Sequence, residues 1–287
     1  MKNFKIKSYC KINLSLRVIR KLRNGYHNIM SYITFCDLHD IIVISKTKNF
    51  KDEIIFSGRF KGGISRKSNT ITKVLGLLRK NRFLKNQHFR INVKKNIPHG
   101  SGLGGGSSNA AYLLNHLNSK MKLKLNKNNI KKFANKIGFD VPINLEKKNT
   151  FLTGKRNEIS RFNKKFGFNL LIIYPNLICR TGEIYRKNKK ISFLKPKTLF
   201  KINNKRKMID FLKKENNDLE KIVIKTYPKV GKIIKYIKSQ KGCYFSRITG
   251  SGSACIGIFS NMKNAIYAQK SLRLKYPKYW CIVSKTI

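Results

Sequence analysis

The stretch that decides the fold is IPHGSGLGGGSSNAAYLL, from Ile97 to Leu114. Five glycines fall within residues 100–106, and two serines and an apolar run follow them. Glycine tolerates positive φ angles and lets another group approach the backbone closely. The N–H groups of such a loop can surround an anion, and the helix that follows adds its free N–H groups and the positive end of its dipole. The segment therefore predicts a phosphate site rather than a flexible linker.

Three common phosphate-binding motifs do not describe this loop. The Walker A motif ends in Gly-Lys-Ser/Thr, and no lysine occurs between Gly100 and Asn118. Gly100, Gly102 and Gly105 fit G-x-G-x-x-G, but that match is weak in a glycine run, and the acidic residue expected about 20 positions later is missing. The protein-kinase signatures H-R-D and D-F-G are missing as well.

The charge of the chain allows two interpretations. Its 287 residues include 64 Lys and Arg against 12 Asp and Glu, which gives a net charge of +52. Such a chain could bind nucleic acid through phosphate contacts. The basic residues are spread along the chain, however, and Lys, Asn and Ile are over-used together, as a genome rich in A and T would produce. We favour compositional bias and keep nucleic-acid binding as an alternative.

The cysteines and the N-terminus indicate a cytoplasmic protein. None of the six cysteines forms a C-x-x-C pair, so no zinc site is predicted, and single thiols among apolar neighbours are typical of a reducing compartment. The first 16 residues contain no continuous apolar segment typical of a secretory signal. No apolar run approaches the roughly 18 residues of a membrane span. Neither a zinc site nor a membrane partner is therefore expected, and no protein residue is assigned as a metal ligand.

The hydrophobic pattern predicts an α+β protein of two domains, which we place at 1–155 and 156–287. Strands and helices follow one another without regular βαβ alternation. The expected strands lie within 4–19, 32–47, 89–98, 169–175, 244–260 and 279–287, and the expected helices within 71–81, 107–118, 126–139, 217–239 and 261–277. Ser68, Asn69 and Thr70 are expected to cap the first helix.

The glycine loop resembles the second motif of the GHMP kinases, the family of galactokinase, homoserine, mevalonate and phosphomevalonate kinases. The segments YCKINLSLRVIRKLRNGYHNI, IGFDVPINL, ENNDLEKIVIKTYP and TGSGSACIGIF resemble further family segments in the family's order. The resemblance covers nearly the whole chain. It implies an N-terminal domain like ribosomal protein S5 domain 2, a ferredoxin-like C-terminal domain, and transfer of the γ-phosphate of ATP to a small alcohol.

The resemblance also implies which residues bind ATP. The loop would wrap the phosphates, Asn69 and Lys95 would contact the nucleotide, and the turn from Thr249 to Gly252 would close over the site. Mg²⁺ bridging the phosphates is expected from the chemistry, with Ser107 or Ser108 as contacts that the sequence does not separate. The expected ATP-binding residues of the loop are Pro98, His99, Gly100, Ser101, Gly102, Leu103, Gly104, Gly105, Gly106, Ser107 and Ser108.

Asp140 and Lys11 are the catalytic pair that the resemblance implies. Acids are scarce in this chain, and Asp140 lies among apolar neighbours, between a predicted helix end and a predicted apolar strand. Without the resemblance, Asp140 could also be a helix-terminal residue that bonds local backbone, and Lys11 would be read as one lysine among many. With it, Asp140 would accept the proton of the acceptor hydroxyl, and Lys11 would bond that hydroxyl and stabilise the transferring group.

The resemblance also indicates the acceptor, and it gives a binding role to the hairpin NGYH, which from the residues alone could be an ordinary hairpin rim. The glycine loop most resembles that of the family branch whose acceptor substrate is an alcohol that carries a cytidine diphosphate group. There Tyr26 and Tyr185 would stack on the cytosine, His27 would bond its edge, and Asn13 would lie near the polyol hydroxyls. A homoserine or mevalonate type is the alternative, because those relatives need no cytosine platform. We expect no nucleic-acid partner and a monomer or weak homodimer.

Overall fold

The chain forms two compact units in the computed structural model, which describes residues 3–23, 25, 27–153, 158–189, 191–192 and 202–287. The first unit contains residues 1–11, 38–99 and 104–147, and the second contains residues 12–37, 100–103 and 148–287. Strands β1 (Phe4–Asn13) and β3 (His27–Thr47) each contribute residues to both units.

A sheet of β-strands forms one layer of the first unit. The C-terminal part of β3 pairs antiparallel with β5 (His88–Lys94), and β4 (Glu53–Ser57) pairs parallel with β5. In β5 the apolar residues Phe89, Ile91 and Val93 alternate with exposed polar ones. This alternation gives the sheet one apolar face, and the helices of the unit cover it.

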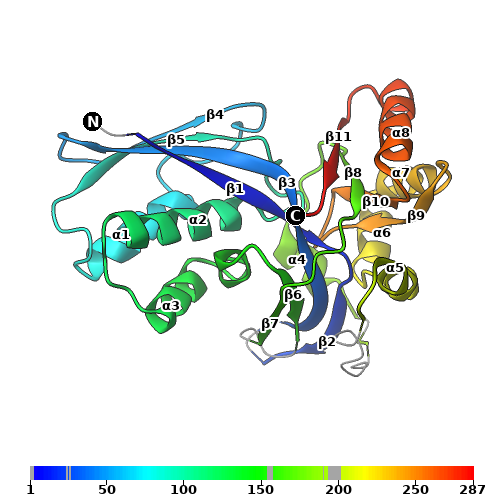
Figure 1. Cartoon of the computed structure of the whole chain (residues 1–287), viewed down its shortest axis with the longest axis horizontal. Helices are drawn as coiled ribbons and strands as arrows, with labels where there is room; N and C mark the ends of the chain where they lie inside the picture. Colours follow the sequence, from blue (N-terminus) through cyan, green and yellow to red (C-terminus); the bar gives the residue numbers. More distant parts are fainter. Residues whose placement is uncertain (1–2, 24, 26, 154–157, 190, 193–201) are drawn as a thin grey trace. The chain divides into compact units, whose positions relative to one another are not determined.

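Three helices pack against that apolar face (Figure 1). They are α1 (Thr70–Lys80), α2 (Gly105–Lys120) and α3 (Lys127–Ile137). Asn69 caps α1, because its side-chain oxygen accepts hydrogen bonds from the backbone of Ile71 and Thr72, and Thr72 completes a capping box. A short 3-10 helix (Pro142–Leu145) follows α3 and also contacts α2.

The second unit includes a small antiparallel group of strands. The N-terminal part of β3 pairs with β2 (Arg17–Lys21) and with β6 (Asn149–Leu152), and β6 pairs with β7 (Ile159–Phe162). The hairpin between β2 and β3 contains Gly25, whose φ of +78° is a left-handed conformation that favours glycine.

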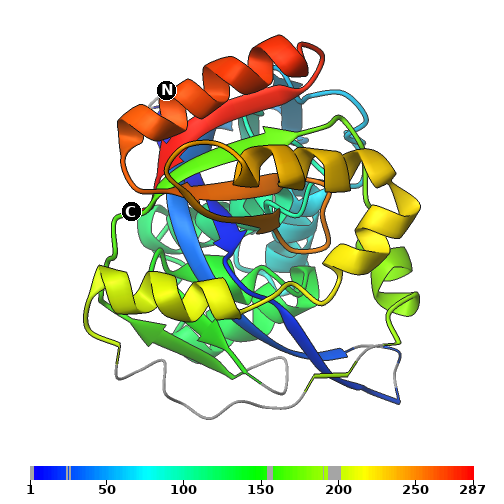
Figure 2. The ribbon, with the colours of Figure 1, turned by 90° about the vertical axis from the view of Figure 1, so that its right-hand side faces the viewer.

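A four-stranded antiparallel sheet forms the rest of the second unit's frame. Its strands are β8 (Asn169–Tyr174), β9 (Cys243–Ile248), β10 (Cys255–Phe259) and β11 (Trp280–Lys285), in the order β11-β8-β10-β9. Helices α7 (Pro228–Lys238) and α8 (Met262–Lys275) cover one face (Figure 2). This order and these two crossover helices are those of a ferredoxin-like fold.

Three shorter helices complete the second unit: α4 (Thr181–Arg186), α5 (Lys205–Lys214) and α6 (Glu220–Thr226). The predicted α+β class is confirmed, as are the helices and strands expected from the pattern. One local prediction was wrong, because a 3-10 helix rather than a strand follows Asp140. The proposed domain boundary after residue 155 stays a prediction. No helix in the described ranges has the length and apolarity that a membrane crossing requires.

Candidate active site

The first unit brings Lys11 and Asp140 together. The Nζ atom of Lys11 lies 3.3 Å from Oδ2 of Asp140. The Lys11 side chain is 5% exposed, whereas that of Asp140 is 42% exposed. Residues 129 positions apart in sequence therefore form one ion pair, with a buried cation and an acid that solvent or a ligand can reach. This is the geometry that a proton acceptor steadied by an ammonium group requires.

The backbone of Gly104 lies close to the side chain of Lys11. It precedes α2 with a φ of +71°, and a Cβ atom at this position would lie 2.7 Å from Cγ of Lys11. A side chain at position 104 would therefore both strain the backbone and displace Lys11. The start of α2 and the Lys11 side chain can therefore lie in contact because residue 104 is glycine.

Residues 100–103 of the glycine loop belong to the second unit, where they pack against the turn from Thr249 to Gly252. A Cβ on Gly102, whose φ is +81°, would lie 2.1 Å from the carbonyl oxygen of Thr249. The backbone N–H of Ala254 donates to the carbonyl of Ser101 at 3.0 Å. The two glycine-rich segments that the sequence singled out are therefore packed backbone against backbone within this unit.

The two serines that the sequence left open differ in the structure. The hydroxyl of Ser108 is fully buried and donates to the carbonyl of Tyr9 at 2.6 Å. Ser107 is only partly buried, in the first turn of α2. Ser108 therefore anchors the helix to β1, Ser107 is the more accessible of the two serines, and contact of either with a phosphate stays a prediction.

Other residues predicted to bind ATP have protein partners. The polar side-chain atoms of Asn69 bond backbone groups at the start of α1 and in residues 65–66. Lys95 is 2% exposed and donates to the carboxylate of Asp40. His99 bonds the carbonyl of Gly62 at 2.8 Å, and Pro98 is buried. Their contact with ATP stays a prediction.

The second unit brings His27 and Tyr185 together. Their ring centroids are 5.2 Å apart with an interplanar angle of 37°. Burial and the neighbouring charge of Lys21 lower the pKa of His27, so its imidazole is neutral at pH 7. Asn13 is buried, with its amide donating to the hydroxyl of Ser31 at 2.8 Å. Tyr26 lies outside the described residues.

Sequence reasoning missed a cluster of polar side chains that bonds the turn from Thr249 to Gly252 and strand β2 of the hairpin. Asn217 donates to the carbonyl of Gly250 at 2.8 Å, and Asp218 accepts from the backbone N–H of Val18 at 2.8 Å. Glu215 forms a two-point ion pair with Arg17, with distances of 2.6 and 3.0 Å. The segment ENNDLE is similar to a family segment, and that resemblance does not indicate these contacts. Three acidic residues in a chain so poor in acids were the signal for a structural role.

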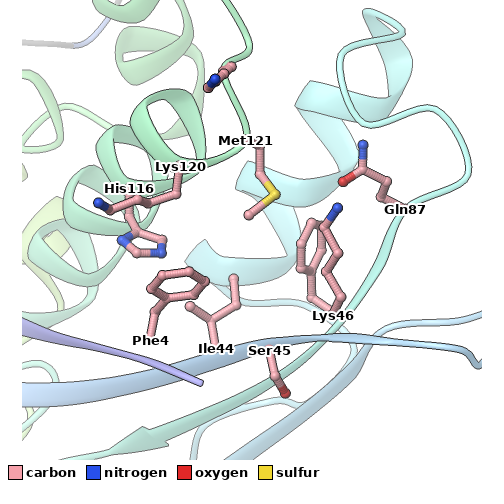
Figure 3. A pocket seen from close by; sticks show the side chains of 10 residues that line it. Phe4, Ile44, Ser45, Lys46, Gln87, His116, Lys120 and Met121 are labelled. Carbon is pink, nitrogen blue, oxygen red and sulfur yellow. The ribbon is translucent and has the colours of Figure 1, made fainter. Parts of the chain in front are cut away.

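A separate cavity of about 400 Å³ lies in the first unit, near the C-terminal end of α2 (Figure 3). Phe4, Ile44 and Met121 provide apolar lining, and His116 and Lys120 project from α2. The residues predicted for ATP, for the acceptor or for catalysis do not line it. The candidate active site is therefore built around the Lys11–Asp140 pair, at the opposite end of this helix.

The residues near the glycine loop suit Mg²⁺ only as a partner of ATP. Mg²⁺ in kinases is held by one or two carboxylates together with the substrate's phosphates, and it keeps several waters. Within the described ranges, no group of three or more His, Cys, Asp or Glu side chains could hold a metal. The partly exposed carboxylate of Asp140 and the partly buried Ser107 are two residues of the first unit that carry oxygen donors.

Family models match both parts of the chain. The GHMP kinases N terminal domain matches residues 69–146, which include the glycine loop and Asp140. The GHMP kinases C terminal domain matches residues 202–278. The fold resembles that of a crystal structure of 4-(cytidine 5'-diphospho)-2C-methyl-D-erythritol kinase, with a TM-score of 0.78, 21% identity and coverage of 99% of this chain and 100% of that one. It also resembles homoserine kinase from Cytophaga hutchinsonii, with a TM-score of 0.75, 14% identity and coverage of 100% and 95%.

Sequence comparison gives a narrower result. The chain is 41% identical to the 4-diphosphocytidyl-2-C-methyl-D-erythritol kinase of Pelagibacter ubique over 290 residues, which cover both chains completely. It is 32% identical to the enzyme of that name from Caldanaerobacter subterraneus, covering 99% of this chain and 96% of the relative. The chain therefore belongs to the GHMP kinases and, within them, to the 4-diphosphocytidyl-2-C-methyl-D-erythritol kinase family.

Proposed function

We propose that the chain transfers the γ-phosphate of ATP to the 2-hydroxyl of 4-diphosphocytidyl-2-C-methyl-D-erythritol. This reaction belongs to the methylerythritol phosphate route to isoprenoids. The full-length identity to relatives with that name supports the choice of acceptor. The observation that carries the chemistry is the 3.3 Å ion pair of Lys11 and Asp140 beneath Gly104.

The acceptor hydroxyl would lose its proton to Asp140. The carboxylate is accessible, and its Oδ2 atom is fixed by the buried Lys11 ammonium. As the hydroxyl oxygen attacks the γ-phosphorus, the bond from that phosphorus to the β,γ-bridging oxygen breaks and ADP leaves. Phosphoryl transfer needs mainly positioning and charge stabilisation, which the N–H groups of the loop and the Lys11 ammonium would provide. Mg²⁺ bound with ATP would neutralise the phosphate charges.

The cytidyl end of the acceptor would bind to the second unit. An aromatic face from Tyr185 and the neutral imidazole of His27 supply stacking and one hydrogen-bond donor and acceptor. Tyr26 would add a second ring, and Asn13, two residues beyond Lys11 on β1, would contact the polyol. These four residues are the proposed acceptor site.

An assay of ADP release with three acceptors tests the proposal. The purified chain would receive the cytidyl substrate, mevalonate and homoserine in parallel, with Mg²⁺ and ATP. We expect turnover with the cytidyl substrate that exceeds the other two by at least about a hundredfold in kcat/KM, because a site that bonds a base discriminates against ligands that lack it. Preference for mevalonate or homoserine, or steeply salt-dependent DNA binding without kinase activity, would contradict it.

A further inference from the structure

A fully buried charged pair lies in the first unit, at the base of the glycine loop. Lys95 is 2% exposed and Asp40 is 0% exposed, and the Lys95 ammonium donates to Oδ2 of Asp40. The same ammonium donates to Oδ1 of Asn109 at 2.9 Å. Removal of two charges from water is costly, and apolar residues of similar volume often replace such pairs without loss of stability. The presence of this pair therefore calls for a reason other than stability.

Asp40 fixes the path of the chain into the loop. Its Oδ1 atom accepts the backbone N–H groups of Asn96 at 2.7 Å and Ile97 at 2.8 Å. These two residues immediately precede Pro98, where the predicted ATP-binding loop begins. One carboxylate thus holds both the buried ammonium and the two peptide groups that lead into the loop.

Asn109 and two serines extend the same network to α2 and β1. The amide of Asn109 donates to Ser8 and to Asp40, each at 3.0 Å. Ser8 donates to the hydroxyl of Ser108 at 2.9 Å, and Ser108 donates to the carbonyl of Tyr9 at 2.6 Å. Tyr9 is two residues before Lys11 on β1. The network therefore connects the first turns of α2 to the strand segment that carries the catalytic lysine.

The Lys95 ammonium lies against the first residue of α2. A Cβ atom built on Gly105 would lie 3.4 Å from Nζ of Lys95 and 2.9 Å from Cγ2 of Ile97. Burial lowers the pKa of Lys95, and the charge of Asp40 opposes that shift. The ammonium therefore lies beside the end of the helix whose free N–H groups would meet the phosphates.

From this arrangement we infer that Lys95 and Asp40 are positioning residues for phosphoryl transfer. The buried side chains of this pair fix the loop entry, the first turn of α2 and the Lys11 segment of β1 relative to one another. The inference rests on the proposed kinase function and adds residues to it. Small displacements of reacting groups lower rates strongly, so loss of the pair should lower kcat by about tenfold to a hundredfold.

Three variants and one control test this role. Lys95→Met removes the ammonium. Asp40→Asn removes the carboxylate charge but keeps an oxygen that can accept from the backbone N–H groups. The double variant removes both charges, so that no unpaired charge stays buried. Arg79→Met is the matched control. Arg79 pairs with Asp52 at 2.5 and 2.8 Å, and this pair joins α1 to β5 away from the predicted site residues. Each variant is measured for kcat, KM for ATP, thermal unfolding, and hydrogen exchange of residues 104–109.

The positioning role predicts a specific combination of results. Lys95→Met, Asp40→Asn and the double variant lower kcat with a smaller change in KM for ATP, and they accelerate exchange in residues 104–109. Arg79→Met lowers the unfolding temperature but leaves kcat and this exchange unchanged.

Two results would overturn the inference. In the first, Lys95→Met raises KM for ATP while kcat and exchange stay unchanged, which would make Lys95 a direct ligand contact. In the second, all variants lose only stability, as the control does. If the wild-type chain lacks kinase activity, the proposed function fails, while the exchange measurement still decides whether the pair holds the loop.

Discussion

The proposed chemistry depends on a few single residues. The sequence indicated some of these residues directly, some only through the family resemblance, and one not at all. Asp140 was conspicuous because acids are rare, and Lys11 was identifiable only through the family resemblance. The resemblance predicts contact of Lys95 with ATP, which stays a prediction, and the structure shows that its ammonium donates to Asp40 and Asn109. Asp40 was missed because a single acid within a predicted strand gives no sign of what lies opposite it. Its partners come from a strand end and a helix far along the chain.

The aromatic contact of the second unit leads to a residue-scale prediction. Tyr185→Ala should raise KM for the cytidyl substrate by about tenfold, because stacking of a base on an aromatic ring contributes about 1–3 kcal/mol. KM for ATP should stay nearly unchanged. Steady-state kinetics with each substrate varied in turn measure both values. Tyr267→Ala, at a 56% exposed tyrosine of α8, is the control and should change neither. Equal increases in both KM values would argue against stacking.

The elements of the fold were predictable where their signals are local. The residues Ser68, Asn69 and Thr70 predicted the start of α1, where Asn69 is the cap, and the strand predicted within 89–98 is β5. The short strands β6 and β7 were not predicted, because four residues contain too few alternations to be distinguished from a loop. The segment after Asp140 was assigned to a strand for its apolar residues, but Pro142 at its first position suits a helical turn.

At the same scale, the start of α2 depends on glycine at position 104. Gly104→Ala should lower kcat by at least about tenfold, because the methyl group would meet the Lys11 side chain at 2.7 Å and the φ of +71° disfavours alanine. Gly76→Ala within α1, where a Cβ meets no atom within 4 Å, should keep activity and raise stability by up to about 1 kcal/mol. Kinetics and urea unfolding of both variants provide the test. Full activity of Gly104→Ala would contradict the close contact.

For the molecule as a whole, charge is the dominant feature. The structure places several of the few acids inside, since Asp40, Glu215 and Asp218 are each at most 5% exposed. Buried Lys11, Arg17, Lys95 and Arg247 offset these acids, so the surface keeps nearly the whole net charge of +52. Repulsion among exposed lysines opposes the folded state, and salt screens it. The ferredoxin-like arrangement of the second unit followed from family resemblance, because strand order is a long-range property that local patterns do not contain.

Salt should consequently stabilise this protein. Raising NaCl from about 20 mM to 300 mM shortens the Debye length from roughly 20 Å to about 6 Å. We expect the midpoint of thermal unfolding to rise by several degrees, followed by circular dichroism at constant pH. Equal increases with NaCl and KCl would indicate screening. A constant or falling midpoint would show that repulsion among the lysines is not a main destabilising factor.

The central claim is that Asp140, held by Lys11, accepts the proton of the acceptor alcohol. The most direct test is kcat of Asp140→Asn at saturating ATP and cytidyl substrate, with Asp210→Asn, at a surface acid whose side chain is 56% exposed, as the control. The account predicts that Asp140→Asn lowers kcat by about 10² to 10⁴ while the control retains wild-type turnover. Near wild-type turnover of Asp140→Asn would contradict it.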